Sequence, residues 1–251
     1  RGSGFADAPT LVCRFGSFAA TAATWLSATE VRCTSPASAP MALEVRVANN
    51  GADFSLQSGA TQPRFAVHGV TSVASLTPAS GARSGGTVVL VRGANFVNNT
   101  LLRCRFGAHT IGAVWVSTER IACVAPSGAA SGADVVAVEV ASNAQEWTQS
   151  DLTFTFIDTA AAMSIAPRAV MVGAAAQIVV AGAHFANTSA LACAFYATGA
   201  GASGAATGVV AGPARWISAS SVACTVTASV ATSARVALAN NGIDFGAGGP
   251  T

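Results

Sequence analysis

The chain contains no lysine, a single tyrosine and few charged residues, and each of these shortages limits what it can do. Charged residues make up only 10% of the 251 positions, all 13 basic side chains are arginines, and the formal net charge is +2. Because the arginines are scattered, there is no large basic field of the kind that nucleic-acid binding requires. The absence of lysine, together with abundant Ala, Gly and Arg, indicates the codon usage of a GC-rich genome more than a functional requirement.

Long apolar runs and clusters of chemically active side chains are also missing. No apolar run approaches the roughly 18 to 20 residues needed to cross a bilayer, so we expect no membrane insertion within this segment. His68, His109 and His184 lie in unrelated places, and none sits in a motif with an acid and a nucleophile. The sequence therefore predicts no catalytic residue, no cofactor site and no enzymatic activity.

What the chain does contain is one pattern that occurs three times. In each copy a Trp is followed two places on by Ser, six places on by a β-branched residue and eight places on by Cys. The three copies run from Trp25 to Cys33, from Trp115 to Cys123 and from Trp216 to Cys224. This self-similarity predicts a tandem array of one module.

The repeat extends on both sides of this pattern. Upstream, a Gly is followed three places on by Phe, and that Phe eight places on by another Cys; the three cysteines are Cys13, Cys104 and Cys193. They are 91 and 89 residues apart, the size of a small β-sandwich domain. We expect modules at residues 1–69, 70–159 and 160–251, the first without its N-terminal strands and the last without its C-terminal strand, within a longer polypeptide.

Alternating apolar and polar residues predict strands throughout, and no long window shows helical periodicity. In module one the strands are expected at residues 10–15, 22–26, 30–34, 42–48 and 64–67; in module two, 87–92 should be covered on both faces and 152–157 should close the sheet. Asn49, Asn50 and Gly51 indicate a tight hairpin turn. About a dozen Gly- and Ala-rich residues inserted after Tyr196 are interpreted as a tolerated surface loop.

Six cysteines at matching positions are the clearest indication of where the protein is located, inside or outside the cell. The repeat pairs Cys13 with Cys33, Cys104 with Cys123 and Cys193 with Cys224, although six cysteines allow 15 connectivities. Buried free thiols are the alternative, but matched pairs in small β domains usually form an extracellular disulfide framework. A metal site is disfavoured because no CxxC occurs and no His recurs beside the cysteines.

Two acceptor sequons for N-linked glycans occupy closely corresponding places. Asn98 with Thr100 and Asn187 with Ser189 both follow the Gly-to-Phe segment of their module. Sequons are frequent by chance, but two in the same loop of two modules favour their use. We therefore predict N-linked glycans at Asn98 and Asn187.

The module resembles the IPT/TIG domain, an immunoglobulin-like fold found in plexins, hepatocyte growth factor receptors, fibrocystin-type proteins and many protist surface proteins. The residues that carry the resemblance form four motifs: Gly93 with Phe96; Cys104, Phe106 and Gly107; Ile121, Cys123 and Pro126; and the segment Val45 to Phe54. The resemblance implies a two-sheet sandwich with an internal disulfide, and it implies no activity because the fold serves many roles. Module three departs from the pattern at Ala194 and Tyr196, and it has no Pro after the second Cys of the module.

Two recurring residue types have a functional and a structural interpretation. In each module one acid follows the late turn, which comes after the alternating strand near the end of the module: Asp53, Glu146 and Asp244. One acid per module is poor support for a calcium site, so we favour carboxylates that stabilise the turn. The three repeated tryptophans could be glycan platforms; their fixed spacing to the cysteines favours core positions.

Three functions are consistent with these observations. The first, which we favour, is a structural or adhesive extracellular rod in a surface filament or coat, such as an algal cell wall or a ciliary mastigoneme, whose partners are copies of itself and other filament components. The second is a spacer in the ectodomain of a receptor or of a polycystin-like or plexin-like membrane protein. The third is an accessory region of a secreted carbohydrate-active enzyme. Disulfides, sequons and weak positive charge argue against a DNA-binding Rel-type role.

Overall fold

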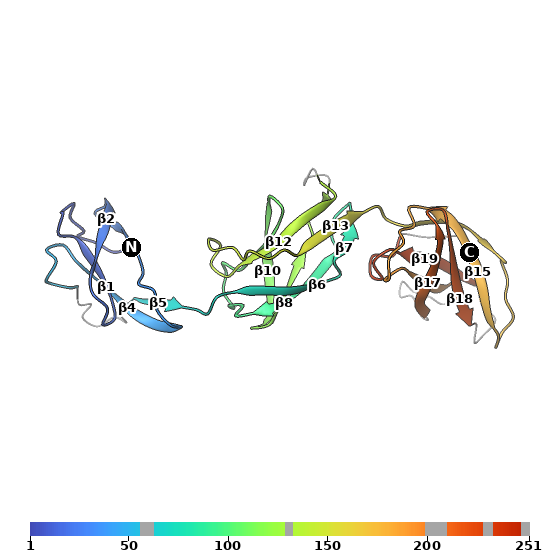
Figure 1. The fold of residues 1–251 in the computed structure, drawn as a ribbon, viewed down its shortest axis with the longest axis horizontal. Coiled ribbons are helices and arrows are strands. Elements are labelled where there is room, and N and C mark those ends of the chain that lie inside the picture. The colour runs from blue at the N-terminus through green and yellow to red at the C-terminus, as the bar shows by residue number, and fades with distance from the viewer. Residues whose placement is uncertain (56–62, 129–132, 199–209, 228–232, 247–251) are drawn as a thin grey trace. The chain divides into compact units, whose positions relative to one another are not determined.

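The structure, a computed structural model, describes residues 1–55, 63–128, 133–198, 210–227 and 233–246. The elements of these residues are β-strands (Figure 1), which confirms the predicted all-β fold. The chain divides into two compact units, Arg1–Val70 and Thr71–Thr251. We call strands β1 to β5 repeat one, β6 to β13 repeat two and β14 to β19 repeat three. The Gly- and Ala-rich insertion falls largely on 199–209, outside the described residues.

Repeat one is a five-stranded sheet with the order β3-β2-β1-β4-β5. Its strands lie close to the predicted ranges: β1 Val12–Phe15, β2 Thr21–Ser27, β3 Glu30–Cys33, β4 Met41–Ala48 and β5 Arg64–Val67. Cys13, Phe15 and Leu43 form its buried core, and the Phe15 ring meets Phe65 edge-on at 5.5 Å. The alternation in β4 therefore places its apolar row inward, as the sequence predicted.

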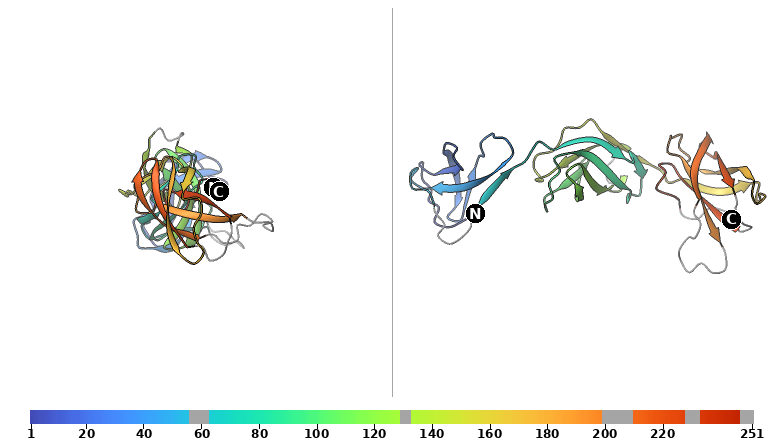
Figure 2. Two further views of the ribbon diagram at one scale, coloured as in Figure 1. Left: turned by 90° about the vertical axis from the view of Figure 1, so that its right-hand side faces the viewer. Right: turned by 90° about the horizontal axis from the view of Figure 1, so that it is seen from below.

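Repeat two contains eight strands in the order β6-β8-β11-β10-β9-β12-β13-β7. The first four are β6 Ser72–Thr77, β7 Ser80–Ala82, β8 Val88–Ala94 and β9 Arg103–Phe106. The others are β10 His109–Ser117, β11 Arg120–Val124, β12 Val135–Ala141 and β13 Thr153–Ile157. The strand β10 pairs with β9 through His109 to Gly112 and with β11 from Ala113 onward, so it connects the two layers of the sandwich. The curvature of this sheet is visible in Figure 2.

Both layers of repeat two bury apolar side chains against a common core. Val136, Val138 and Val140 alternate inward along β12, as predicted. From β13, the ring of Phe154 lies edge-on to the ring of Phe106 at 5.4 Å and to that of Phe156 at 5.2 Å. This aromatic trio fills the space between the layers.

Repeat three has the order β14-β15-β18-β17-β16-β19. Its strands are β14 Ala161–Ala166, β15 Ala175–Ala183, β16 Ala192–Thr198, β17 Val210–Ser218, β18 Ser221–Thr227 and β19 Ser233–Ala239. The strand β17 again pairs with one neighbour through its first half and with the other through its second half. Ile178, Val180, Val222 and Leu238 are buried in a core of its own.

The recurring Trp-x-Ser pattern marks a β-bulge. In all three repeats the strand register shifts between the Trp and the Ser, for example between Trp115 and Ser117. The Ser hydroxyl then accepts a hydrogen bond from the backbone N–H two residues on, as Ser117 does from Glu119 at 3.2 Å. The serine therefore stabilises the turn that leads into the second cysteine strand.

The repeated tryptophans cover the core rather than fill it, so the prediction of core positions was only partly right. The indole N–H of Trp115 donates to the Phe96 carbonyl at 3.1 Å, and Trp25 and Trp216 make the same bond to Phe5 and Phe185. In repeats two and three, Trp115 and Trp216 are only partly buried, and it is the Phe of the Gly-to-Phe segment that is buried, at 3% exposure for Phe185 and 2% for Phe96. Gly93 is required beside it, because a Cβ there would lie 1.9 Å from the Ser72 carbonyl oxygen.

Two further predictions were wrong in detail. The strand β8 is not covered on both faces: Val89 and Val91 are buried, but Val88 is 56% exposed because it points out of the sandwich. Asn49, Asn50 and Gly51 do not form a tight hairpin, because β5 begins only at Arg64. Here Gly51 has a φ of 77° within a longer turn that Asn50 organises.

Candidate functional site

The late turn of each repeat has the same side-chain hydrogen bonds. In repeat three, Asn241 Oδ1 accepts from the backbone N–H groups of Ile243 and Asp244 at 3.1 and 2.8 Å, and its amide donates to the Asp244 carboxylate at 2.8 Å. Asn50 and Asp53 repeat this arrangement in repeat one, and Asn143 and Glu146 do so in repeat two. The acids are thus turn carboxylates in all three repeats, as the sequence analysis favoured.

In repeat three this turn lies against repeat two. The Asp244 carboxylate accepts hydrogen bonds from the Ala82 N–H at 3.2 Å and from the Thr87 hydroxyl. The amide of Asn241, which is only 5% exposed, also donates to the Ser80 carbonyl at 2.9 Å. One Asn and one Asp therefore satisfy backbone and hydroxyl groups of the preceding repeat. We call Asn240 to Asp244 the docking turn and residues 80–87 the docking loop.

The link between repeats two and three adds charged contacts beside the docking turn. Asp158 Oδ1 lies 3.2 Å from Arg83 Nε, and its Oδ2 lies 3.6 Å from His184 Nδ1. Asn240 holds the same link by donating to the Asp158 carbonyl at 3.1 Å. Arg83 also forms a 2.6 Å ion pair with Asp134, and this hydrogen bond lowers the pKa of the Asp134 carboxyl and raises that of Arg83. Because these groups are exposed, their ion pairs contribute little to stability.

Cavity volumes distinguish the docked turn from its counterpart in repeat one. The residual cavity between Asn240, Asn241 and Asp244 and the end of repeat two is about 10 Å³. The surface lined by Asn49, Asn50 and Asp53 holds an open cavity of about 340 Å³. The same three side-chain positions are thus packed in repeat three and solvent-accessible in repeat one.

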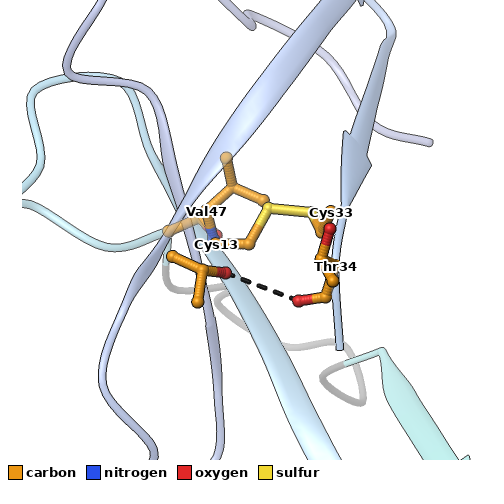
Figure 3. Close-up of a disulfide and its surroundings, with 6 residues drawn as sticks. Cys13, Cys33, Thr34 and Val47 are labelled. Carbon is orange, nitrogen blue, oxygen red and sulfur yellow. Dashed lines mark hydrogen bonds between the residues drawn. A yellow bond between two sulfur atoms is a disulfide. The ribbon is translucent and has the colours of Figure 1, made fainter. Parts of the chain in front are cut away.

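The predicted cysteine pairs are brought together by the strands that carry them. Cys13 is bonded to Cys33, Cys104 to Cys123 and Cys193 to Cys224. Figure 3 shows the first of these bonds, which links β1 to β3 beside Val47 of β4. Each disulfide crosses between strands that are not direct neighbours in the sheet order.

The two sequon asparagines lie on exposed loops. Asn98 and Asn187 are both exposed, each two residues after the buried Phe of its repeat. The neighbour of Asn98, Asn99, is instead engaged: its amide donates to the Ser142 carbonyl at 2.9 Å and its Oδ1 accepts from the Leu101 N–H. N-glycosylation of Asn98 and Asn187 stays a prediction, and the geometry leaves both amides accessible.

Other functional groups do not gather into a reactive site in the described part of the chain. No three His, Cys, Asp or Glu side chains among those residues lie close enough to hold a metal ion. Across the same residues, no helix is long and apolar enough to cross a membrane. Of the docking residues, Asp244 was identified from the sequence only as a turn carboxylate; Asn241 and the contact with the preceding repeat were not identified.

The repeated sandwich, with its inter-layer disulfide and shared late turn, defines the chain as a tandem array of immunoglobulin-like modules. A family model described as IPT/TIG domain matches residues 1–64 and 72–156. The chain belongs to the IPT/TIG family. The internal repeat extends the same module to repeat three, whose disulfide, bulge and turn correspond to those of the other two.

Comparison with solved structures gives resemblances at low identity. A structure of the full extracellular region of plexin A4 is 17% identical, with 89% of this chain and 18% of that chain covered and a TM-score of 0.49. Bacteroides ovatus SGBP-B, solved in complex with a mixed-linkage heptasaccharide, is 11% identical, with 95% of this chain and 56% of that chain covered and a TM-score of 0.29. The chain thus spans less than a fifth of the plexin region. No curated protein matches it.

IPT/TIG domains are typically non-catalytic immunoglobulin-like modules. Together with three disulfides in 251 residues, the family indicates an extracellular or cell-surface protein. The junction between repeats two and three is the feature through which we interpret the role of this chain.

Proposed function

We propose that this chain is a non-catalytic structural segment of a larger extracellular glycoprotein, in which IPT/TIG repeats join end to end to form a rod in a surface filament or coat. The observation that carries the proposal is the docking turn of repeat three, whose Asn241 and Asp244 bond to Ser80, Ala82 and Thr87 of repeat two. A flexible linker would leave these groups in water. Their mutual hydrogen bonds favour a module built to hold its neighbour.

The open cavity of repeat one supports the same interpretation. Asn49, Asn50 and Asp53 repeat the polar groups of the docking turn, and they are exposed. In the proposed array, another IPT/TIG repeat would cover this surface as repeat two covers the docking turn. The filament would then contain copies of this chain or related proteins, on an algal cell wall or a ciliary surface.

The experiment that tests this function is cross-linking mass spectrometry on the native material. Because these 251 residues contain no lysine, amine-reactive reagents find no side chain to join here, and the reagent should instead join the carboxylates of the 11 acidic residues. We expect links between the repeats of different copies. Links to a single membrane protein, without links between copies, would contradict the filament and would favour a spacer in a receptor ectodomain.

Replacing Asp244 by Ala should weaken the junction. The change removes the acceptor of the Thr87 hydroxyl and leaves that hydroxyl buried, so we expect a loss of about 2 kcal/mol in unfolding free energy. Repeats two and three should then unfold in separate calorimetric transitions. The matched control is Asp53→Ala, which removes the same turn carboxylate where it is exposed and where, among the described residues, its side chain bonds to Asn50 alone. Equal losses in the two variants would refute a role for Asp244 beyond its own turn.

We also expect N-linked glycans on Asn98 and Asn187. Intact-mass measurement of the native protein should show glycan mass that an endoglycosidase removes, and Asn98→Gln should delete one glycan. Asn99→Gln provides the control, since it changes the adjacent side chain while preserving the sequon formed by Asn98 and Thr100. An unmodified mass at both asparagines would remove glycan presentation from the proposed function.

A further inference from the structure

An unusual pair of arginines lies on the outer face of repeat one. Arg14 of β1 and Arg46 of β4 are direct cross-strand partners in an antiparallel register. Like charges placed directly opposite each other on a sheet repel and destabilise it. Arg46 has a carboxylate neighbour, Glu44 Oε2 at 3.0 Å, whereas the described residues include no carboxylate paired with Arg14.

The other two repeats have different residues at these positions. In repeat two, Arg105 faces Glu139, and Glu139 Oε2 accepts hydrogen bonds from both Nε and Nη2 of the guanidinium. In repeat three the corresponding residues are Ala194 and Ala237, so the pair is absent. Only repeat one keeps the arginine and replaces its carboxylate partner by a second arginine.

An aromatic ring orients the arginine in both charged repeats. The guanidinium carbon of Arg105 lies 4.4 Å from the centre of the Trp147 ring, and that of Arg14 lies 3.8 Å from the centre of Phe54. Stacking holds the guanidinium plane and leaves its N–H groups directed along that plane. In repeat two these N–H groups donate to a carboxylate, that of Glu139. In repeat one no carboxylate of the described residues is paired with Arg14.

Neighbouring side chains increase the positive charge of this face. Arg64 of β5 pairs in register with Glu44, so this part of the sheet carries three arginines, Arg14, Arg46 and Arg64, and the one carboxylate of Glu44, which is paired with Arg46. All three side chains come from the open sheet face of repeat one, where β1, β4 and β5 lie side by side. The local charge is therefore positive and is not neutralised within this face.

We propose that Arg14 and Arg46 form a binding site for the carboxylate or sulfate groups of an acidic polysaccharide. The ligand oxyanion would occupy the place that Glu139 fills in repeat two and would relieve the repulsion between the two arginines. An extended polysaccharide carries such groups at regular intervals, suits an open sheet face better than a closed pocket, and belongs to the extracellular setting of the chain. The inference is independent of the proposed docking of repeats.

The test measures binding of the full chain to immobilised polygalacturonate, which carries carboxylates, and to dextran sulfate, with neutral dextran as the baseline. The wild-type chain should bind one acidic polymer, more weakly as salt rises. Arg46→Glu gives repeat one the arrangement of repeat two and should lower affinity by about tenfold, as expected for losing charge-assisted hydrogen bonds. Arg14→Gln should also weaken binding. The polymer that binds identifies the oxyanion.

The control variant carries the same change in charge at an exposed arginine of repeat two, Arg120→Glu. We expect less than a twofold effect from it. Thermal unfolding of the Arg1–Val70 unit is measured for each variant, because Arg46→Glu adds an ion pair with Arg14 but removes the one with Glu44; lower affinity in a variant that melts like the wild type cannot be attributed to unfolding. Equal loss in Arg46→Glu and Arg120→Glu, or no wild-type binding, would overturn the site. Equally tight binding to polyglutamate would replace the polysaccharide by an acidic protein partner.

Discussion

Replacing Phe154 by Ala should cost about 4 kcal/mol of unfolding free energy, close to the upper end of measured core truncations. The side chain is fully buried between the layers of repeat two, and its ring contacts two others, Phe106 and Phe156. Removing it leaves a cavity bounded by two aromatic edges that the strands β9 and β13 hold in place. The free energy lost includes both the transfer of the ring to water and the contacts of its neighbours.

Chemical unfolding followed by tryptophan fluorescence would measure this loss, because repeat two contains Trp115 and Trp147. The comparison is Val114→Ala, an apolar truncation on β10 of the same repeat at a side chain that is 66% exposed. That variant should change stability by less than about 0.5 kcal/mol. If both variants had the same small effect, the aromatic trio would not be the core of repeat two.

The second large effect should come from the disulfides. Replacing Cys104 and Cys123 together by Ala opens a loop of 19 residues in sequence separation, for which loop-entropy arguments give about 3 kcal/mol. Both cysteines are fully buried, so the substitution also removes packed sulfur atoms from the core. Reduction of the wild-type protein should destabilise all three repeats by a similar mechanism.

Comparison between units makes this prediction specific. The Cys13→Ala/Cys33→Ala variant should destabilise the Arg1–Val70 unit and leave the Thr71–Thr251 unit unchanged. The Cys104→Ala/Cys123→Ala variant should do the reverse. Calorimetric melting that stays the same in the presence of reductant would show that the disulfides do not stabilise the fold.

Local sequence patterns predicted most of the strands because the repeat supplies three examples of each. The alternation around Val138 gave the buried row of β12, and the matching positions of the cysteines in the repeat gave the same pairs that the structure bonds. The Trp-x-Ser spacing was visible in the sequence, but the β-bulge that explains it was not. A β-bulge changes strand register without a distinctive residue, so it emerges only when Trp115 and Ser117 are placed against their partner strand.

Features that depend on contacts between distant segments could not be read from the sequence. Asp244 and Asp53 occupy the same turn motif, yet Asp244 bonds to Thr87, 157 residues earlier in the chain. Likewise, Val88 and Val89 are both valines in an apolar strand, and only the second faces the core. The arginine pair of repeat one required the register of β1 against β4, which sequence spacing alone does not give.

The parallel pairing of β7 with β13 has a mechanical consequence. Thr155, Phe156 and Ile157 lie beside Ser80, Gly81 and Ala82, so an early strand of repeat two runs alongside its last strand in the same direction. Tension applied to the two ends of the repeat would slide these strands past each other. Two backbone hydrogen bonds would then carry the load together in shear instead of breaking one after another. They run from the Arg83 N–H to the Ile157 carbonyl and from the Thr155 N–H to the Ala79 carbonyl.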